Sequence, residues 1–222
     1  MSEHADDVGH MFGADFWDER YRSADRVWSG DPNPQLVAEV AGRAPGLALD
    51  VGSGEGADAI WLASSGWMVV GADISGVALE RAARHAEDTD PAAAARIHWW
   101  QADLLAQSPE PGSFDLVSAQ FIQLPPERRV PLFTALAAAV RDSGMLLIVG
   151  HHPSDLEAGV PRPPMPELFY TPEEIASMLG DTWTVRTCEA RPRSAAAPDG
   201  TEVTIHDTVL AAVRGAEPPP AN

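Results

Sequence analysis

A glycine-rich segment with an acidic residue in front of it carries the clearest chemistry in this sequence. The segment DVGSGEG at residues 50–56 follows a short apolar run and precedes a helical pattern. Glycines in a strand-to-helix turn let the backbone bend sharply and let a ligand approach closely. The helix that follows offers its N-terminal amides and the positive end of its dipole. The segment therefore predicts a ligand site; the alternative is a tight turn that binds nothing.

Two more acids follow the next two predicted strands. Asp73 ends the strand predicted over residues 67–73, where its carboxylate can accept hydrogen bonds from both ribose hydroxyls of an adenosine ligand. Asp103 comes just after the strand predicted over residues 96–100 and can accept from the exocyclic amine of adenine. Each acid alone also fits a helix cap or an ordinary turn. Open α/β sheets bind ligands at the carboxyl ends of their strands, so these acids together predict one nucleoside site.

Two adjacent histidines, His151 and His152, follow the apolar strand predicted over residues 145–149. Adjacent strand residues face opposite sides, so only one of the pair points readily into a site. A histidine there can act as general base toward a hydroxyl or thiol acceptor. We assign this role to His152, with His151 as the alternative; both also fit hydrogen-bonded loop positions, and a soft acceptor needs no base. We expect no metal site, because neighbouring histidines on an extended strand rarely chelate one ion.

Alternating strand and helix patterns position these residues, which is typical of an α/β sheet. Asn33 followed by Pro34 marks the start of the first core helix. After a proline-rich loop over residues 151–170, Thr171 begins a short helix with a capping box. The strands we predict cover residues 47–51, 67–73, 96–100, 114–119, 145–149, 182–189 and 203–213, the last two as an antiparallel edge pair. The main helices we predict cover residues 34–43, 57–65, 75–87 and 126–140.

Charge and composition exclude several classes of function. The 222 residues include 33 acidic and 15 basic residues, a net charge of −18, and so acidic a chain repels nucleic acid phosphates. All basic residues are arginine, which excludes a Schiff-base lysine and a P-loop lysine. The single cysteine, Cys188, excludes an internal disulfide and cysteine-based metal sites. No apolar run reaches the ~18 residues of a membrane helix and no signal-peptide pattern begins the chain, so we expect a cytoplasmic protein.

The motifs resemble those of class I S-adenosylmethionine-dependent methyltransferases, over roughly residues 15–214. The resemblance rests on DVGSGEG, VGADI at residues 70–74, ADL at residues 102–104 and FDLV at residues 114–117. It implies an α/β fold with a Rossmann-like, doubly wound seven-stranded sheet whose last strand is antiparallel. It also implies S-adenosyl-L-methionine as the cofactor, with the glycines on its methionine part. The cofactor-binding residues that it implies are Asp50, Gly52, Ser53, Gly54, Asp73, Ile74, Asp103, Leu104 and Gln120.

The N-terminal segment resembles that of tellurite-resistance and thiopurine methyltransferases. The similar stretches are FWDERYR at residues 16–22 and VWSG at residues 27–30. In that family this segment covers the cofactor and helps to form the acceptor pocket, whereas the alternative is an amphipathic helix packed on the sheet edge. Trp17 and Tyr21 are four residues apart and therefore share one helix face. The substrate-binding residues that we infer are Trp17, Tyr21, Trp28, Gln123 and Tyr170.

We thus predict a methyltransferase that acts on an oxygen, sulfur or nitrogen nucleophile of a small molecule, as a monomer or homodimer without nucleic acid or membrane partners. The expected regions are a helical cap over residues 1–32, the enzyme domain over 33–214 and a tail over 215–222. An NAD(P)-binding Rossmann oxidoreductase is the rival, since Gly52, Gly54 and Ala57 satisfy the G-x-G-x-x-A pattern. Asp50 and Asp103 have no role in that rival. A non-catalytic small-molecule-binding domain is the third reading.

Overall fold

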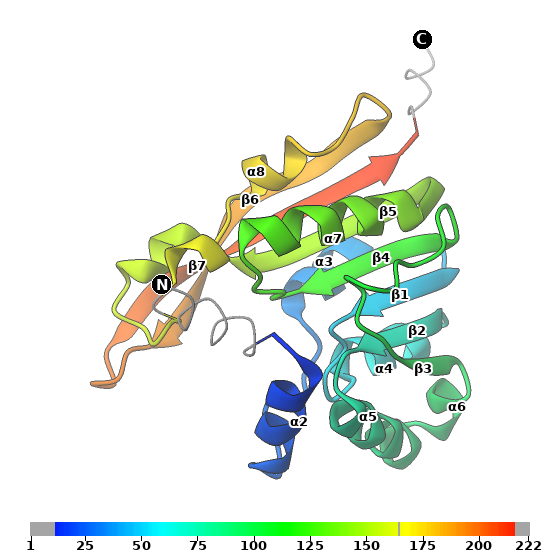
Figure 1. The fold of residues 1–222 in the computed structure, drawn as a ribbon, viewed down its shortest axis with the longest axis horizontal. Coiled ribbons are helices and arrows are strands. Elements are labelled where there is room, and N and C mark those ends of the chain that lie inside the picture. Colours follow the sequence, from blue (N-terminus) through cyan, green and yellow to red (C-terminus); the bar gives the residue numbers. More distant parts are fainter. Residues whose placement is uncertain (1–11, 164, 216–222) are drawn as a thin grey trace. The chain divides into compact units, whose positions relative to one another are not determined.

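The computed structural model describes residues 12–163 and 165–215, in which strands and helices alternate along the chain (Figure 1). The chain divides into two compact units, Met1–Pro109 and Glu110–Asn222. The strand order is β3-β2-β1-β4-β5-β7-β6 in a seven-stranded sheet, and the last strand, β7, is antiparallel to its neighbours. The predicted fold class is thereby confirmed. Residues 1–11 of the predicted cap and residues 216–222 of the predicted tail lie outside the described residues.

The first unit contains three parallel strands and the helices that connect them. The strands are β1 (Leu47–Val51), β2 (Met68–Asp73) and β3 (Ile97–Gln101). Along β2, Gly71 lies opposite Asp50 of β1, and Asp73 lies opposite Gln101 of β3. The helices are α2 (Ala14–Arg22), α3 (Pro34–Val40), α4 (Ala57–Ser64), α5 (Gly76–Thr89) and α6 (Pro91–Ala94). Because α4 and α5 contact the strands, the residues after β1 and β2 are anchored at both ends.

Side-chain caps confirm the predicted helix starts in this unit. Asn33 Oδ1 accepts from the amide of Gln35 at 2.8 Å, and Ser75 Oγ accepts from the amide of Ala78 at 3.1 Å. The short helix α6 is not among the helices predicted from the sequence. Its signal is Asp90 followed by proline, and the Asp90 side chain accepts from the amides of the second and third helical residues.

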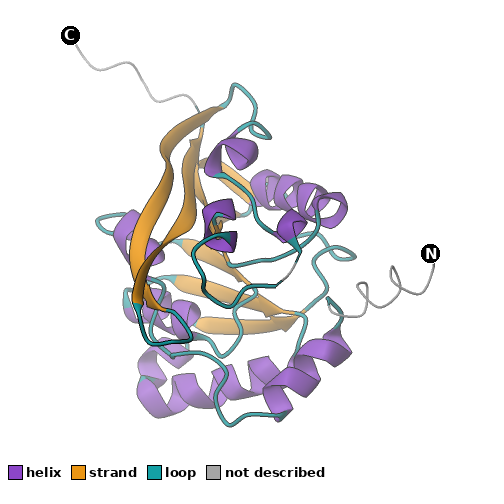
Figure 2. Ribbon diagram, turned by 90° about the vertical axis from the view of Figure 1, so that its left-hand side faces the viewer, coloured by secondary structure: helices purple, strands orange, loops and turns teal. Residues whose placement is uncertain are grey.

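The second unit contains four strands, with an antiparallel hairpin that ends the chain. The strands are β4 (Phe114–Gln120), β5 (Val140–His151), β6 (Trp183–Ala196) and β7 (Glu202–Arg214). The helix α7 (Pro126–Ala139) packs on β4 and β5, and α8 (Pro172–Ala176) packs on β6 and β7. The capping box predicted at Thr171 is present. Figure 2 shows β6 and β7 as a long hairpin, and the loop after β5 forms two short 3-10 turns, η1 (Pro153–Leu156) and η2 (Pro166–Leu168).

Two strands are longer than their apolar runs predict. β5 begins at Val140, but regular pairing with β4 starts only at Met145, after an irregularity in the register. β6 continues to Ala196, past Pro192, where the sequence predicts a loop. Since β6 is the edge strand, a proline without an N–H is tolerated there, and polar side chains face solvent.

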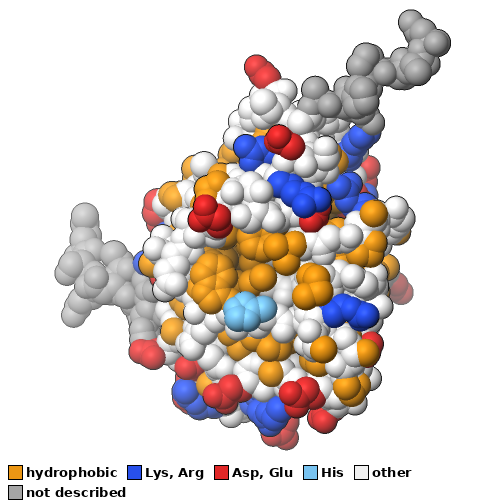
Figure 3. Space-filling model, turned by 90° about the vertical axis from the view of Figure 1, so that its right-hand side faces the viewer, with side chains coloured by type: hydrophobic (Ala, Val, Ile, Leu, Met, Phe, Trp, Pro, Cys, Tyr) orange, Lys and Arg blue, Asp and Glu red, His pale blue; other side chains and the backbone are white. Residues whose placement is uncertain are grey.

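The side chains on one face of the molecule are of several kinds (Figure 3). The face drawn in Figure 3 carries acidic, basic and hydrophobic side chains together. None of the helices in the described part of the chain has the length and apolar character needed to cross a membrane.

Candidate functional site

The turn between β1 and α4 is built on left-handed glycines. Gly52, Gly54 and Gly56 have φ angles of +68°, +52° and +87°, a region that other residues adopt only with strain. Packing adds a second reason at Gly56, because a Cβ there would lie 2.8 Å from the Trp99 ring. The glycine pattern of the sequence therefore reflects backbone conformation and close packing as well as any ligand.

Asp73 ties this turn to the end of β2. Its Oδ2 accepts from the amide of Gly54 and its Oδ1 accepts from the amide of Ser75, both at 2.8 Å. Burial raises the pKa of Asp73, while the hydrogen bonds from the Ser75 and Gly54 amides lower it. Each carboxylate oxygen has two lone pairs, so the side chain can still accept from ligand hydroxyls.

Most amides of the turn are used inside the protein. The amides of Gly52 and Ser53 donate to the carbonyl of Ala72 at 2.8 and 3.1 Å, and the amide of Gly56 donates to the carbonyl of Ser53 at 2.8 Å. The amide of Gly54 is taken by Asp73. A dinucleotide's pyrophosphate is bound by free amides at this position of a Rossmann turn. This geometry therefore disfavours the NAD(P) alternative.

Two buried carboxylates, Asp50 and Asp73, and the half-buried Asp58 lie at or beside the turn and suit a positively charged ligand. Burial, together with the charges of Asp58 and Asp73, raises the pKa of Asp50 well above its usual range. Burial raises the pKa of Asp58 to about 6, although its Oδ1 accepts from the amide of Asn33 at 2.6 Å. A cationic ligand beside these acids would favour their ionised forms, whereas an anionic pyrophosphate would find no positive charge there.

Each unit contains unpaired buried polar atoms among the residues predicted for the site. Within the described ranges, the buried side-chain oxygens and nitrogens without a hydrogen-bond partner are Asp50 Oδ2, Ser53 Oγ, Gln120 Oε1 and His151 Nδ1. Buried polar groups are normally paired, so such atoms point to a ligand or a functional role. Three of the four belong to predicted cofactor residues. S-adenosylmethionine offers hydroxyl and ammonium donors and a positive sulfonium, which fit these oxygen acceptors and the buried acids.

The cap residues of the first unit lie directly on the turn. Trp28 Nε1 donates to Tyr21 Oη at 2.9 Å, and a Cβ on Gly54 would lie 2.9 Å from that Oη and 3.4 Å from that Nε1. The Trp17 ring lies 6.3 Å from the Tyr21 ring, and Arg20 lies over the rings of both tryptophans. Burial raises the pKa of Tyr21 to about 12. The structure thus brings Tyr21 and Trp28 to the predicted cofactor turn, with Trp17 beside Tyr21.

The predicted adenine contacts follow β2 and β3. Ile74 is half-buried, Leu104 is buried, and Asp103 is exposed. The Asp103 side chain accepts from the amide of Leu105 at 3.0 Å, so it shapes its own turn. The adenine role of these residues stays a prediction.

In the second unit, His151 at the end of β5 lies between aromatic rings. Its ring centroid is 4.7 Å from that of Phe121 and 6.3 Å from that of Phe169. Phe121 has a φ of +53°, rare for a bulky residue and a mark of stored strain that often accompanies function. Beside it, Gln120 Nε2 donates to Ser118 Oγ at 2.6 Å, which leaves the unpaired Oε1.

Burial lowers the pKa of His151 to about 4, with help from Arg162 and Arg193 and opposition from Asp155. His151 is therefore neutral at pH 7. Its Nδ1 lies 3.9 Å from Oδ2 of Asp155, a fully buried carboxylate that also accepts from Arg162 Nη2 at 2.7 Å. The carboxylate favours the tautomer with the proton on Nδ1, which leaves Nε2 as an acceptor.

His152 has a different environment, as strand alternation predicts. Its Nδ1 accepts from the amide of Ser154 at 3.2 Å and lies 2.9 Å from the Ser154 hydroxyl, so the ring caps η1. This geometry favours His151 over His152 as the functional histidine, since local capping already uses His152. In the described ranges, no group of three or more His, Cys, Asp or Glu side chains is arranged to hold a metal ion.

Tyr170 lies in the core of the second unit, not at the rim of a pocket. It is 1% exposed, its ring is 5.7 Å from that of Phe133, and the Arg129 guanidinium lies 4.9 Å from the ring centroid. The Tyr170 hydroxyl also lies against Gly150, where no Cβ would fit. Substrate contact by Tyr170 therefore requires a rearrangement, whereas Gln123 is half-buried after β4.

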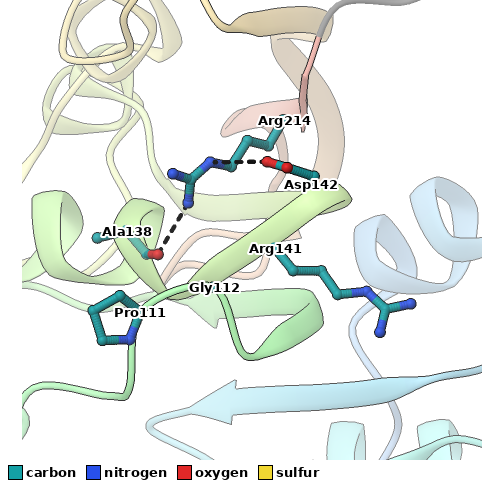
Figure 4. Close-up of a pocket in the computed structure, with 6 residues that line it drawn as sticks. All are labelled: Pro111, Gly112, Ala138, Arg141, Asp142 and Arg214. Carbon is teal, nitrogen blue, oxygen red and sulfur yellow. Dashed lines mark hydrogen bonds and ion pairs between the residues drawn. The ribbon is translucent and has the colours of Figure 1, made fainter.

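A hollow of about 480 Å³ elsewhere in the second unit holds none of the predicted site residues. Its lining consists of Pro111, Gly112, Ala138, Arg141, Asp142 and Arg214 (Figure 4). Arg214 donates to the carbonyl of Ala138 at 3.0 Å and lies 3.9 Å from Asp142, while Arg141 pairs with Asp115. Its arginines are thus engaged by the protein, and the hollow is not the candidate site.

Comparisons with known proteins point to the methyltransferase fold. Residues 48–144, which include the glycine turn, match a family model described as a methyltransferase domain. A solved structure concerned with conversion of a disulfide bond into a thioacetal group during echinomycin biosynthesis is 25% identical, with 91% of each chain covered and a TM-score of 0.70. TehB from Haemophilus influenzae is 16% identical over 90% of this chain and 66% of its own, with a TM-score of 0.66. Magnesium protoporphyrin IX methyltransferase from Synechocystis, solved with bound S-adenosylhomocysteine, is 22% identical over 94% and 98%, with a TM-score of 0.64.

Proposed function

We propose that this chain, in which residues 48–144 match a methyltransferase domain, is a class I S-adenosylmethionine-dependent methyltransferase that methylates an oxygen, sulfur or nitrogen nucleophile of a small molecule. The observation that carries the proposal is the surroundings of His151. Only 18% of its side chain is exposed, between the rings of Phe121 and Phe169. The accessible part of the imidazole is therefore small and is bordered by apolar rings. Such surroundings suit an acceptor that is small and partly apolar. The net charge of −18 supports an acceptor other than nucleic acid, and we further propose a cytoplasmic enzyme without a membrane partner.

We assign cofactor binding to the turn and the strand ends. Asp73 would accept from the ribose hydroxyls, and the acid-lined turn with Asp50 would favour the positive charges of the methionine part. Ile74, Asp103 and Leu104 would flank the adenine. The remaining proposed cofactor residues are Gly52, Ser53, Gly54 and Gln120. The cofactor supplies a methyl group on a cationic sulfur; the protein's part is to align the acceptor and to exclude water.

We assign His151 the role of orienting the acceptor. A group with a pKa of about 4 is a weak base at pH 7, so full proton removal from an alcohol is unfavourable. A neutral ring can accept a hydrogen bond at Nε2 from the acceptor's O–H, S–H or N–H group while Nδ1–H faces Asp155. This arrangement suits a thiol or amine, which needs little help from a base.

An assay with S-adenosylmethionine labelled in its methyl group tests this proposal. The labelled cofactor is offered with panels of small thiols, phenols and amines, and separately with RNA and with total protein. We expect label in one of the small-molecule panels. We also expect His151→Phe to lower turnover about 10- to 100-fold with little change in S-adenosylhomocysteine affinity.

His152→Phe in the same assay tests the assignment between the two histidines. We expect a far smaller loss of turnover than with His151→Phe, since His152 caps η1. The reverse order of effects would return the role to His152. Label confined to RNA or protein would contradict a small-molecule acceptor.

A further inference from the structure

We propose that Glu55, the residue between the last two glycines of the turn, is a positioning residue that holds the cap against the cofactor site. The proposal rests on the proposed cofactor binding at this turn, and it adds a residue that does not itself contact the cofactor. Its basis is a set of hydrogen bonds between residues far apart in the sequence, all within the first unit.

The Glu55 carboxylate binds the cap through its backbone. Its Oε2 accepts from the amide of Val27 and from the amide of Trp28, both at 3.1 Å. The Glu55 side chain is only 11% exposed, so its carboxylate is largely shielded from water although Trp28 itself is exposed. Two consecutive amides on one carboxylate oxygen fix the backbone from which the Trp28 ring projects, and bonds to a charged acceptor are the stronger kind.

Arg81 of α5 completes the attachment. Its Nη1 donates to Glu55 Oε1 at 3.2 Å and to the carbonyl of Asp25 at 3.2 Å. One guanidinium nitrogen therefore offsets the charge of Glu55 and makes its own bond to the cap segment. The Arg81 side chain is 21% exposed, less accessible than an ordinary surface ion pair, so salt screens it less.

A second attachment holds the other end of the cap. Asp18 of α2 accepts from the Ser75 hydroxyl at 2.6 Å and from the amide of Val77 at 3.3 Å, at the start of α5. Between the two attachments, Tyr21 and Trp28 are bonded to each other over Gly54. Asp18 thus places Tyr21, and Glu55 places its partner Trp28.

Loosening Glu55 should therefore free Trp28 from the turn while the turn itself keeps its glycines and Asp73. A cofactor under a loosened cap loses part of its cover, so it should dissociate faster and bind more weakly. A purely structural role for Glu55 predicts lower stability with unchanged binding of the cofactor.

The test uses the 222-residue chain with S-adenosylhomocysteine as the probe. Affinity is measured by calorimetry, the dissociation rate by stopped-flow tryptophan fluorescence, and stability by thermal melting. The variants are Glu55→Ala, Glu55→Gln and Arg81→Ala. Asp90→Ala is the matched control, because Asp90 also accepts from two backbone amides in the first unit but caps α6.

We expect Glu55→Ala to weaken binding about tenfold, mainly through faster dissociation. Glu55→Gln should fall between Glu55→Ala and wild type, because its amide oxygen still accepts from the cap but no longer pairs with the charge of Arg81. Arg81→Ala should weaken binding a few-fold. Asp90→Ala should lower the melting temperature and leave affinity unchanged.

Wild-type affinity and dissociation rate in the Glu55 and Arg81 variants, whatever their melting temperatures, would overturn the proposal. If Glu55→Ala does not fold, the affinity and dissociation rate of Glu55→Gln and Arg81→Ala, compared with wild type, decide whether the proposal holds. A wild-type protein that does not bind S-adenosylhomocysteine contradicts the cofactor site itself, a result distinct from equal binding by wild type and variants.

Discussion

The carboxylate of Asp73 accepts a hydrogen bond from the backbone amide of Gly54 at 2.8 Å. This bond joins the end of β2 to the turn after β1, so the acid proposed for the ribose and the glycine proposed for the methionine part form one rigid piece. The other Asp73 oxygen accepts from the amide of Ser75, at the cap of α5. A change at Asp73 is therefore expected to alter local structure together with the proposed ligand binding.

Asp73→Ala is expected to weaken S-adenosylhomocysteine binding by about tenfold to a hundredfold, because losing a hydrogen bond to a charged group costs about 1.5–3 kcal/mol. It should also lower the free energy of unfolding by about 1–3 kcal/mol, since two buried amides lose their acceptor. Asp73→Asn keeps one side-chain oxygen, so its affinity and stability should lie between those of Asp73→Ala and wild type. Calorimetry and urea denaturation measure both effects. Unchanged affinity in a folded Asp73→Ala protein would show that Asp73 only caps and braces the turn.

Gly54→Ala should destabilise the protein more than Gly42→Ala. Both glycines have positive φ, +52° and +78°, which costs an alanine about 1–2 kcal/mol. Only at Gly54 would the new Cβ also meet Tyr21 Oη, at 2.9 Å, whereas nothing lies within 4 Å at Gly42. In a Tyr21→Phe background the cost of Gly54→Ala should shrink, as a double-mutant cycle in urea would show. Equal costs for the two glycines would contradict close packing of the cap on the turn.

Strands and helix starts can be predicted from the sequence where the signal is local. The apolar runs of β1 and β2 and the caps at Asn33 and Ser75 are found correctly, because buried parallel strands are continuously apolar and a cap lies beside its helix. The end of β6 is missed because edge pairing tolerates Pro192 and alternating polar residues.

Site residues, too, can be predicted where the signal is local and are missed where the partners are distant in sequence. The glycine turn and Asp73 can be found because their types and spacing are characteristic. Glu55 and Asp155 are missed, since their partners Trp28 and Arg162 come from other segments and no spacing rule links them. The choice between the adjacent histidines likewise needs their three-dimensional surroundings.

Asp58→Asn should stabilise the protein at pH 7. Burial raises the folded-state pKa of Asp58 from 3.8 to about 6, so its contribution to stability is full below pH 3.8 and is lost as the pH rises through 6. Asparagine does not ionise, and its oxygen can still accept from the amide of Asn33. We expect a gain of about 1–3 kcal/mol at pH 7 and a much smaller gain at pH 4, measured by urea denaturation. A gain independent of pH would contradict the raised pKa.

His151→Phe should reduce the loss of stability, measured as the free energy of unfolding, between pH 7 and pH 4. Burial lowers the folded-state pKa of His151 from 6.5 to about 4. The contribution of the neutral imidazole to the free energy of unfolding is therefore full above pH 6.5 and is lost as the pH falls through 4. Wild type should lose about 2–3 kcal/mol through this group between pH 7 and 4, and the variant should not. The charged groups Asp155, Arg162 and Arg193 remain the same in both proteins. Parallel profiles for the two proteins would contradict a buried neutral imidazole.

Calorimetric titration of the 222-residue chain with S-adenosylhomocysteine, and separately with NAD, decides what the turn binds. Most of the turn's amides are used internally and its acids offer a pyrophosphate no positive charge, so we predict saturable one-to-one binding of S-adenosylhomocysteine and no heat with NAD. At about 100 times its dissociation constant the ligand should stabilise the fold by roughly 2.7 kcal/mol. Saturable binding of NAD with none of S-adenosylhomocysteine would contradict a methyltransferase site at Asp50, Gly54 and Asp73.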